Sequence, residues 1–120
     1  MDPYTIAKIL KFRDERNWKQ FHTPRDLAIS ISIEAAELLE HFQWDPSDED
    51  ISTKKEAIAE ELADVLIYCT YLSDTLHLDM DKIVCNKIDK NSRKYSIEKS
   101  FGNSRKYSEL EDRKDDRLSK

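Results

Sequence analysis

Apolar residues recur every three or four positions along much of this chain, which is the spacing of one face of an α-helix. The first such stripe comprises Ile6, Ile9 and Leu10, continues to Arg13 and is expected to face inward. Asp2 is a good N-cap and Pro3 fits the first helical turn, so we expect the first helix to begin there and to continue through Arg16.

Two longer apolar runs predict a pair of central helices. The sequence from Thr23 to Asp26 is a helix-start signal, and a second helix is expected to run from it to about His41 or Phe42. Residues 28–33 alternate between apolar and polar as a half-buried strand would. The pattern then continues in the helical spacing without a break, which favours a helix.

The other central helix is predicted downstream of an acidic loop, residues 43–50, that opens with Trp44. The sequence Thr53 to Glu56 matches a capping box, so this helix is expected to run from there to about Leu76. Ten of the sixteen residues from 27 to 42 are apolar, and twelve of the sixteen from 57 to 72 are. Helices this apolar are expected to be buried on most sides.

A fourth helix is predicted to begin near Asp79. Its expected core contacts are Ile83, Val84 and Ile88. Beyond Tyr95 the helical pattern weakens, and residues 109–120 are almost wholly charged or polar. We therefore expect one all-α domain over residues 1–108, followed by a flexible tail over 109–120.

Composition narrows the class of protein. Among 120 residues, one Gly and three Pro leave few tight turns for a many-stranded sheet, and a net charge of −5 argues against nucleic-acid binding. Cys69 and Cys85 belong to no metal-binding Cys motif. No apolar run approaches the roughly 18 residues of a membrane span, and the start lacks a signal-peptide pattern, so a cytoplasmic protein without membrane contacts is expected.

Paired acids interrupt both central apolar runs. Glu34 and Glu37 share one helical face, and so do Glu61 and Asp64. Neither run contains Lys or Arg, so carboxylates gathered in an apolar setting must become neutral or hold a cation. Oxygen ligands suit Mg²⁺, with Mn²⁺ as a substitute, better than Zn²⁺.

Two alternatives compete with a metal site. The acids could be ordinary solvent-facing stripes on amphipathic helices, as in a non-catalytic helix-bundle interaction module. A di-iron carboxylate bundle would need Glu-x-x-His on two helices, and this chain has none.

With these residues in place, the chain resembles the MazG-like all-α nucleotide pyrophosphohydrolases, and most closely the dCTP pyrophosphatase branch. The resemblance covers residues 12–107. Its carriers are Arg16-Asn17-Trp18-Lys19-Gln20-Phe21-His22-Thr23-Pro24-Arg25, Glu34-x-x-Glu37, Leu39-x-x-Phe42-Gln43-Trp44, Glu60-Glu61-Leu62-Ala63-Asp64-Val65-Leu66-Ile67-Tyr68 and Lys87-Ile88-Asp89-x-Asn91-x-x-Lys94-Tyr95.

The resemblance implies a Mg²⁺-dependent enzyme that cleaves a nucleoside triphosphate between the α and β phosphates, and so removes excess or modified nucleotides. The first-choice substrate is dCTP, with a broader dNTP range, dUTP or phosphoribosyl-ATP as alternatives. It also implies an all-helical fold that dimerises, commonly as a tetramer built from two dimers, with sites between subunits.

The resemblance also implies site residues, at the positions of this chain that match the family's motifs. The metal ligands implied are Glu34, Glu37, Glu61 and Asp64. The nucleotide-binding positions implied are Trp18, His22, Trp44, Tyr68, Lys87, Asn91 and Tyr95, and Lys94 lies on the same expected stripe as Lys87 and Asn91. A carboxylate that is not a ligand could take a proton from the attacking water. The candidates for that base are Glu37, Glu60 and Glu40, and the sequence does not choose among them.

Overall fold

The computed structural model of the chain describes residues 1–44, 52–102 and 104. Within these residues the chain forms five α-helices and one 3₁₀ helix and no strand, which confirms the predicted all-α class. The chain divides into two compact units, Met1–Met80 and Asp81–Lys120, which are described separately. The predicted tail and most of the acidic loop lie outside the described residues, and the boundary at residue 108 stays a prediction.

The first unit begins with α1 (Pro3–Glu15), capped as the sequence predicts. The Asp2 carboxylate accepts a hydrogen bond of 2.7 Å from the Tyr4 N–H. After α1, Asn17 takes a left-handed backbone conformation with φ of 54°. The short 3₁₀ helix η1 (Lys19–Phe21) then leads into the second helix.

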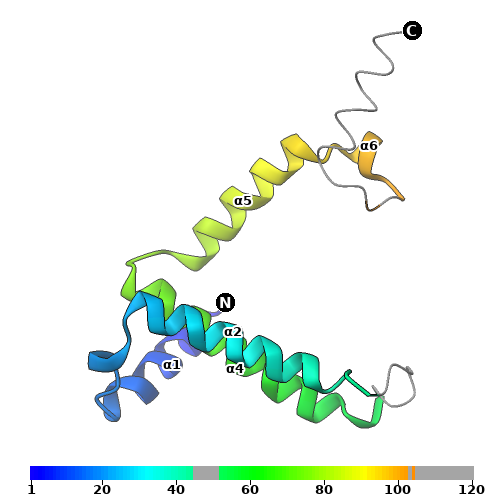
Figure 1. Cartoon of the computed structure of the whole chain (residues 1–120). Coiled ribbons are helices and arrows are strands. Elements are labelled where there is room, and N and C mark those ends of the chain that lie inside the picture. Colours follow the sequence, from blue (N-terminus) through cyan, green and yellow to red (C-terminus); the bar gives the residue numbers. More distant parts are fainter. Residues whose placement is uncertain (45–51, 103, 105–120) are drawn as a thin grey trace, which may run out of the picture. The chain divides into compact units, whose positions relative to one another are not determined.

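The two central helices, α2 (Pro24–Glu40) and α4 (Lys55–Thr75), pack against each other, and the chain runs out along one and back along the other (Figure 1). Thr23 Oγ1 accepts a hydrogen bond from the Asp26 N–H at 3.1 Å, as the start signal predicts. The strand alternative is therefore wrong. The N-cap of α4 is Lys54, which makes no side-chain capping bond, so the helix begins one residue later than a cap at Thr53 predicts.

The core of this unit is small. Among the described residues, Leu27 and Tyr71 are the buried hydrophobic side chains, at 1% and 3% exposure. The expectation that α2 and α4 are buried on most sides is wrong for the single chain, because the two helices have only each other and α1 to pack against. The exposed apolar side chains on these two helices are Ile29, Ile33, Leu39, Leu62 and Leu66.

A buried ion pair joins α1 to the end of α4. Arg13, on the predicted inward stripe, donates from Nη1 to Asp74 Oδ2 at 2.8 Å and from Nε to Asp14 Oδ1 at 2.9 Å. Its guanidinium is only 2% exposed. Burial opposes the charge, but the hydrogen bonds to Asp14 and Asp74 hold the pKa of Arg13 above its ordinary value. Arg13 therefore fixes the angle at which α1 crosses α4.

The second unit contains α5 (Met80–Lys94), whose first residue belongs to the first unit, and α6 (Ile97–Ser100). Ser96 caps α6 by accepting from the Lys99 N–H at 3.4 Å. The predicted core contacts Ile83, Val84 and Ile88 are exposed, so that prediction is wrong: the described residues of the second unit leave the apolar stripe of α5 uncovered. No described helix is long and apolar enough to cross a membrane.

Replacing Leu27 by Ala should lower the free energy of unfolding by about 2–5 kcal/mol, because it removes a fully buried side chain from a small core. Urea denaturation followed by circular dichroism measures this change. The exposed-site control, Tyr4→Ala, should change it by less than about 0.5 kcal/mol. Equal losses in the two variants would contradict the placement of Leu27 in the core.

Candidate metal centre and adjoining pocket

Carboxylates from α2 and α4 meet where the two helices face each other. Glu34, Glu61 and Asp64 each offer an oxygen, and these three atoms lie within 4.8 Å of one another. Three-residue spacing puts Glu61 and Asp64 on one face of α4, and the pairing with α2 brings Glu34 opposite them. Like charges this close repel unless a proton or a cation offsets them.

The electrostatics of the cluster show that repulsion. Burial, a hydrogen bond that the protonated Glu34 carboxyl donates to Glu37, and the charges of Glu37, Asp64 and Glu61 raise the pKa of Glu34 to about 7. Burial and the Glu37 and Asp64 carboxyls also raise the pKa of Glu61, against a smaller opposing effect of His41. His41 Nε2 lies 3.8 Å from Glu61 Oε1. Glu37 thus acts on both partners and belongs beside the cluster.

The donors fit a divalent cation. Oε2 of Glu34 and Oε2 of Glu61 are buried and have no hydrogen-bond partner among the described residues. A buried carboxylate oxygen without a partner is costly, and a cation would compensate both atoms at once. Since the three clustered donors are all oxygens, a hard ion such as Mg²⁺ or Mn²⁺ suits them best.

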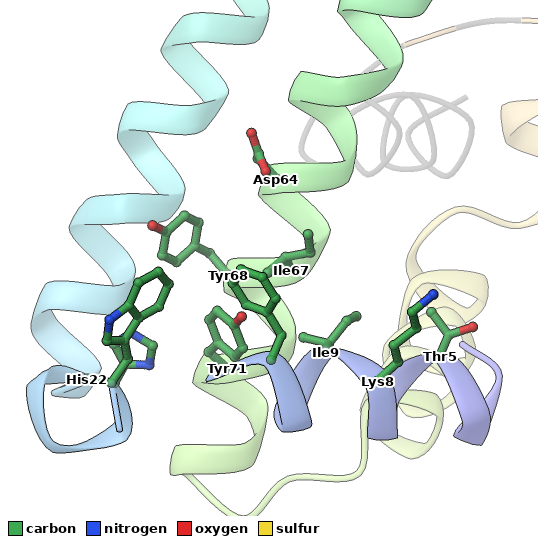
Figure 2. Close-up of a pocket in the computed structure, with 10 residues that line it drawn as sticks. Thr5, Lys8, Ile9, His22, Asp64, Ile67, Tyr68 and Tyr71 are labelled. Atoms are coloured by element: carbon green, nitrogen blue, oxygen red, sulfur yellow. The ribbon is translucent and has the colours of Figure 1, made fainter. Parts of the chain in front are cut away.

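A pocket of about 450 Å³ opens beside the cluster (Figure 2). Asp64 belongs to both the cluster and the pocket wall, so the two are continuous. The rest of the wall is mainly aromatic and aliphatic. Its other residues are Thr5, Lys8, Ile9, Phe12, Trp18, His22, Ile67, Tyr68 and Tyr71.

The aromatic rings of the wall pack on one another in two groups. Trp18 meets Phe12 edge-on at 5.7 Å between centroids, and the Arg16 guanidinium lies 3.6 Å from the Phe12 ring centre. His22 packs on Tyr71 at 5.0 Å, and Tyr68 meets Tyr71 edge-on at 5.9 Å. These rings give the pocket a largely aromatic lining, which suits a planar ring system.

The structure brings together part of the predicted site. Trp18, His22 and Tyr68 line the pocket. Burial and the nearby Glu34, Asp64 and Glu37 charges raise the pKa of the Tyr68 hydroxyl, which places that side chain close to the cluster.

Other predicted residues lie elsewhere. Trp44 is 86% exposed at the end of the described part of its loop and is not in the pocket wall. Glu40 and Glu60 are exposed on α2 and α4, whereas Glu37 is half-buried beside the acids. The remaining predicted nucleotide-binding residues are in the second unit. They are Lys87, Asn91, Lys94 and Tyr95.

Sequence reasoning missed the α1 side of the pocket and Tyr71. A signal for Tyr71 was present, because it follows Tyr68 by three residues on the face that carries Glu61 and Asp64. Phe12, Ile9 and the other α1 residues carried only the general helical pattern, and nothing in the sequence shows that α1 crosses α4 at this point.

Comparison with known proteins gives consistent matches. Residues 29–110 match the model of the MazG-like family. Over 105 residues, the chain is 40% identical to dCTP pyrophosphatase 1 of Homo sapiens and 38% identical to that of Bos taurus. Each match covers 83% of this chain but only 62% of the relative's length. A pyrophosphatase crystal structure from Archaeoglobus fulgidus DSM 4304 matches with a TM-score of 0.73 and 44% identity, over 78% of this chain and 90% of that one.

The raised pKa of Glu34 predicts how stability depends on pH. In metal-free protein the folded state binds more protons than the unfolded chain between the ordinary Glu value of 4.5 and about 7. Stability should therefore fall as the pH rises through this window. Thermal unfolding in EDTA measures the slope.

Glu34→Gln should flatten this dependence and raise the melting temperature above pH 7, because the variant cannot ionise at that position. Glu60→Gln, which changes an exposed acid beside Glu61, is the matched control and should retain the wild-type slope. A slope that is the same in wild type and Glu34→Gln would contradict the assignment.

Proposed function

Since this chain belongs to the MazG-like family, we propose that it is a divalent-metal-dependent nucleotide pyrophosphohydrolase that converts a dNTP and water to a dNMP and pyrophosphate. Its relatives include dCTP pyrophosphatases and an archaeal pyrophosphatase. The chain spans only part of the dCTP pyrophosphatases, so both the activity and its substrate are proposals for this protein.

The observation that carries the proposal is the continuity of the acid cluster with the aromatic pocket through Asp64. A nucleotide has the same two parts, a polyanion and a planar base joined by a sugar. The acids can bind the phosphates only through cations, and the aromatic lining of the pocket offers stacking to the base. A solvent-facing acidic stripe on an interaction module would leave the adjoining pocket without a role.

Glu34, Glu61 and Asp64 are the residues that would hold Mg²⁺, and Glu37 lies beside them as a carboxylate outside this set. The metal supplies neutralisation of the phosphate charge and a lower pKa for water at the site. Of the three candidate bases, we favour Glu37, because it is half-buried and interacts with Glu34 and Glu61. The exposed Glu40 and Glu60 show no such interaction with the cluster.

For the nucleotide, we propose that Trp18, His22 and Tyr68 contact the base and sugar in the pocket. We further propose that Lys87, Asn91, Lys94 and Tyr95 on and beside α5 contact the sugar and phosphates, since Lys and Asn donate hydrogen bonds to phosphate oxygens. Similarity to dCTP pyrophosphatase 1 makes dCTP the first substrate to test. Stacking alone discriminates weakly between bases, so other dNTPs belong in the same panel.

The exposed apolar side chains support assembly into a homodimer, or a tetramer of two dimers. Ile29 and Ile33 on α2, and Leu62 and Leu66 on α4, form stripes at four-residue spacing. Apolar stripes that a single chain leaves exposed are typical of helices that pack against another copy. We propose that a second copy covers these stripes.

With Mg²⁺, the purified protein should release pyrophosphate from dCTP or another dNTP, and EDTA should abolish the release. Glu61→Gln and Asp64→Asn should each lower kcat at least about 100-fold, because each removes a metal-binding oxygen. A coupled pyrophosphate assay over the eight standard NTPs and dNTPs measures the rates.

Glu56→Gln provides a control, since Glu56 is exposed in the first turn of α4 and is not one of the clustered acids. It should keep wild-type activity. Wild-type protein that releases no pyrophosphate from any of the eight nucleotides, or that works equally well in EDTA, would overturn the proposal.

The charged substitution Leu62→Glu should shift the sedimentation-equilibrium mass toward that of one 14.2 kDa chain, because it introduces a charge into the proposed interface. Tyr4→Glu, at an exposed residue of α1, should leave the mass unchanged. Wild-type protein that sediments as a single chain would contradict the assembly while leaving the enzymatic proposal open to its own test.

A further inference from the structure

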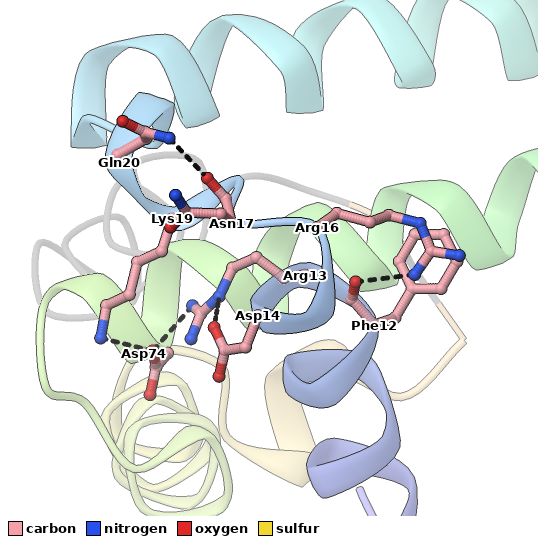
Figure 3. Close-up of polar contacts among 8 residues, drawn as sticks. All are labelled: Phe12, Arg13, Asp14, Arg16, Asn17, Lys19, Gln20 and Asp74. Carbon is pink, nitrogen blue, oxygen red and sulfur yellow. Dashed lines mark hydrogen bonds and ion pairs between the residues drawn. The ribbon is translucent and has the colours of Figure 1, made fainter.

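A second set of charged residues lies where α1, η1 and the end of α4 meet (Figure 3). Arg13 is 2% exposed and is held by Asp14 and Asp74, while Lys19 approaches Asp74 at 3.9 Å. These groups are outside the pocket lining and the acid cluster. A buried arginine that only joined two helices could be replaced by apolar packing at little cost. The groups that the Arg13 side chain faces therefore bear on whether it has a second role.

The Arg13 guanidinium faces the back of a pocket residue. Its central carbon lies 5.8 Å from the centre of the Tyr71 ring, within the range of a cation–π contact. Tyr71 is itself 3% exposed, and its ring packs on His22 at 5.0 Å. The Arg13 guanidinium therefore contacts the Tyr71 ring, which in turn packs on the His22 ring in the pocket wall.

His22 carries an unsatisfied group. Its Nδ1 atom is buried and has no hydrogen-bond partner among the described residues. A buried ring nitrogen without a partner is disfavoured unless a ligand or water supplies one. Since His22 lines the pocket, a ligand bound there could form the missing hydrogen bond with Nδ1.

We propose that Arg13 is a positioning residue: through the Tyr71 ring it fixes the His22 imidazole so that His22 recognises a hydrogen-bonding edge of the bound base. The identity of the ligand as a nucleotide rests on the proposed function. The contact between the Arg13 guanidinium and the Tyr71 ring does not rest on the proposed function, because it is present in the unliganded chain.

Charge supports the same arrangement. Burial, and then the positive charge of Arg13, lower the pKa of His22, so the imidazole is neutral at pH 7 and has one donor and one acceptor nitrogen. The other titratable groups around the pocket are Lys8 on α1 and Asp64, Tyr68 and Tyr71 on α4. Of the charged residues, Arg13 is the one whose charge acts on His22.

The test compares substitutions that separate the positive charge of Arg13 from its role in joining α1 to α4. Arg13→Met removes the cation but keeps an apolar stem, Arg13→Lys restores a cation, and Asp74→Asn removes the ion pair between α1 and α4 but keeps the cation. In metal-free protein, NMR titration of the His22 ring protons should show a higher pKa in Arg13→Met and a return toward wild type in Arg13→Lys. Asp74→Asn should not raise it, because the positive charge beside Tyr71 remains.

Ligand recognition has its own readout. In the loaded enzyme, Arg13→Met should raise KM for the preferred nucleotide by about tenfold, the loss expected for one hydrogen bond, with kcat nearly unchanged. His22→Phe, which keeps a ring on Tyr71 without nitrogen atoms, should raise KM similarly. In EDTA, dCMP and dUMP added to wild type should shift the His22 ring signals to different extents.

Failure of the inference about Arg13 can be distinguished from failure of the proposed enzymatic function. If Arg13→Met and Asp74→Asn change the His22 titration and KM equally, Arg13 merely joins the helices and the inference fails. If His22 titrates identically in wild type and Arg13→Met, the inference also fails. Absence of pyrophosphate release by wild-type protein would overturn the function, while the titration would still decide whether Arg13 controls His22.

Discussion

Mutual repulsion among carboxylates is the constraint on which the rest of the structure depends. Glu34, Glu61 and Asp64 are held within 4.8 Å of one another by the pairing of α2 with α4, without a lysine or arginine in either apolar run. The helices bring the acids together, and the acids in turn oppose the packing of the helices. The interface between α2 and α4 therefore carries a repulsion that a proton or a bound cation would offset.

One face of α4 connects the charged and aromatic parts of the site. Glu61, Asp64, Tyr68 and Tyr71 follow at spacings of three, four and three residues, so a single helical stripe changes from acid to ring. At 1.5 Å per residue this stripe is about 15 Å long. One helix thus carries both the acids and part of the aromatic wall, while α1 and the two residues that flank η1, Trp18 and His22, supply other parts of the wall.

The helix starts and the paired acids could be predicted from the sequence, because they depend on residues that are close together along the chain. The caps at Asp2 and Thr23 and the facing acids follow from spacing along a helix. The pocket wall could not be predicted so fully, because the contribution of Phe12 depends on the crossing of α1 over α4. The exposure of Ile83 was missed for a related reason: an amphipathic stripe shows that a helix needs a covering surface, but not whether its own chain provides one.

The chain reversals beside Arg13 lack glycine. Asn17 and His77 adopt φ of 54° and 55°, and their N–H groups donate to the carbonyls of Asp14 and Asp74, the two residues that hold Arg13. A left-handed L-residue costs roughly 1–2 kcal/mol, and histidine lacks the short amide side chain that makes asparagine more tolerant. The junction beneath the pocket therefore stores conformational strain. Position 77 is consequently a natural starting point for protein engineering, since asparagine there would relieve strain without altering an atom of the site.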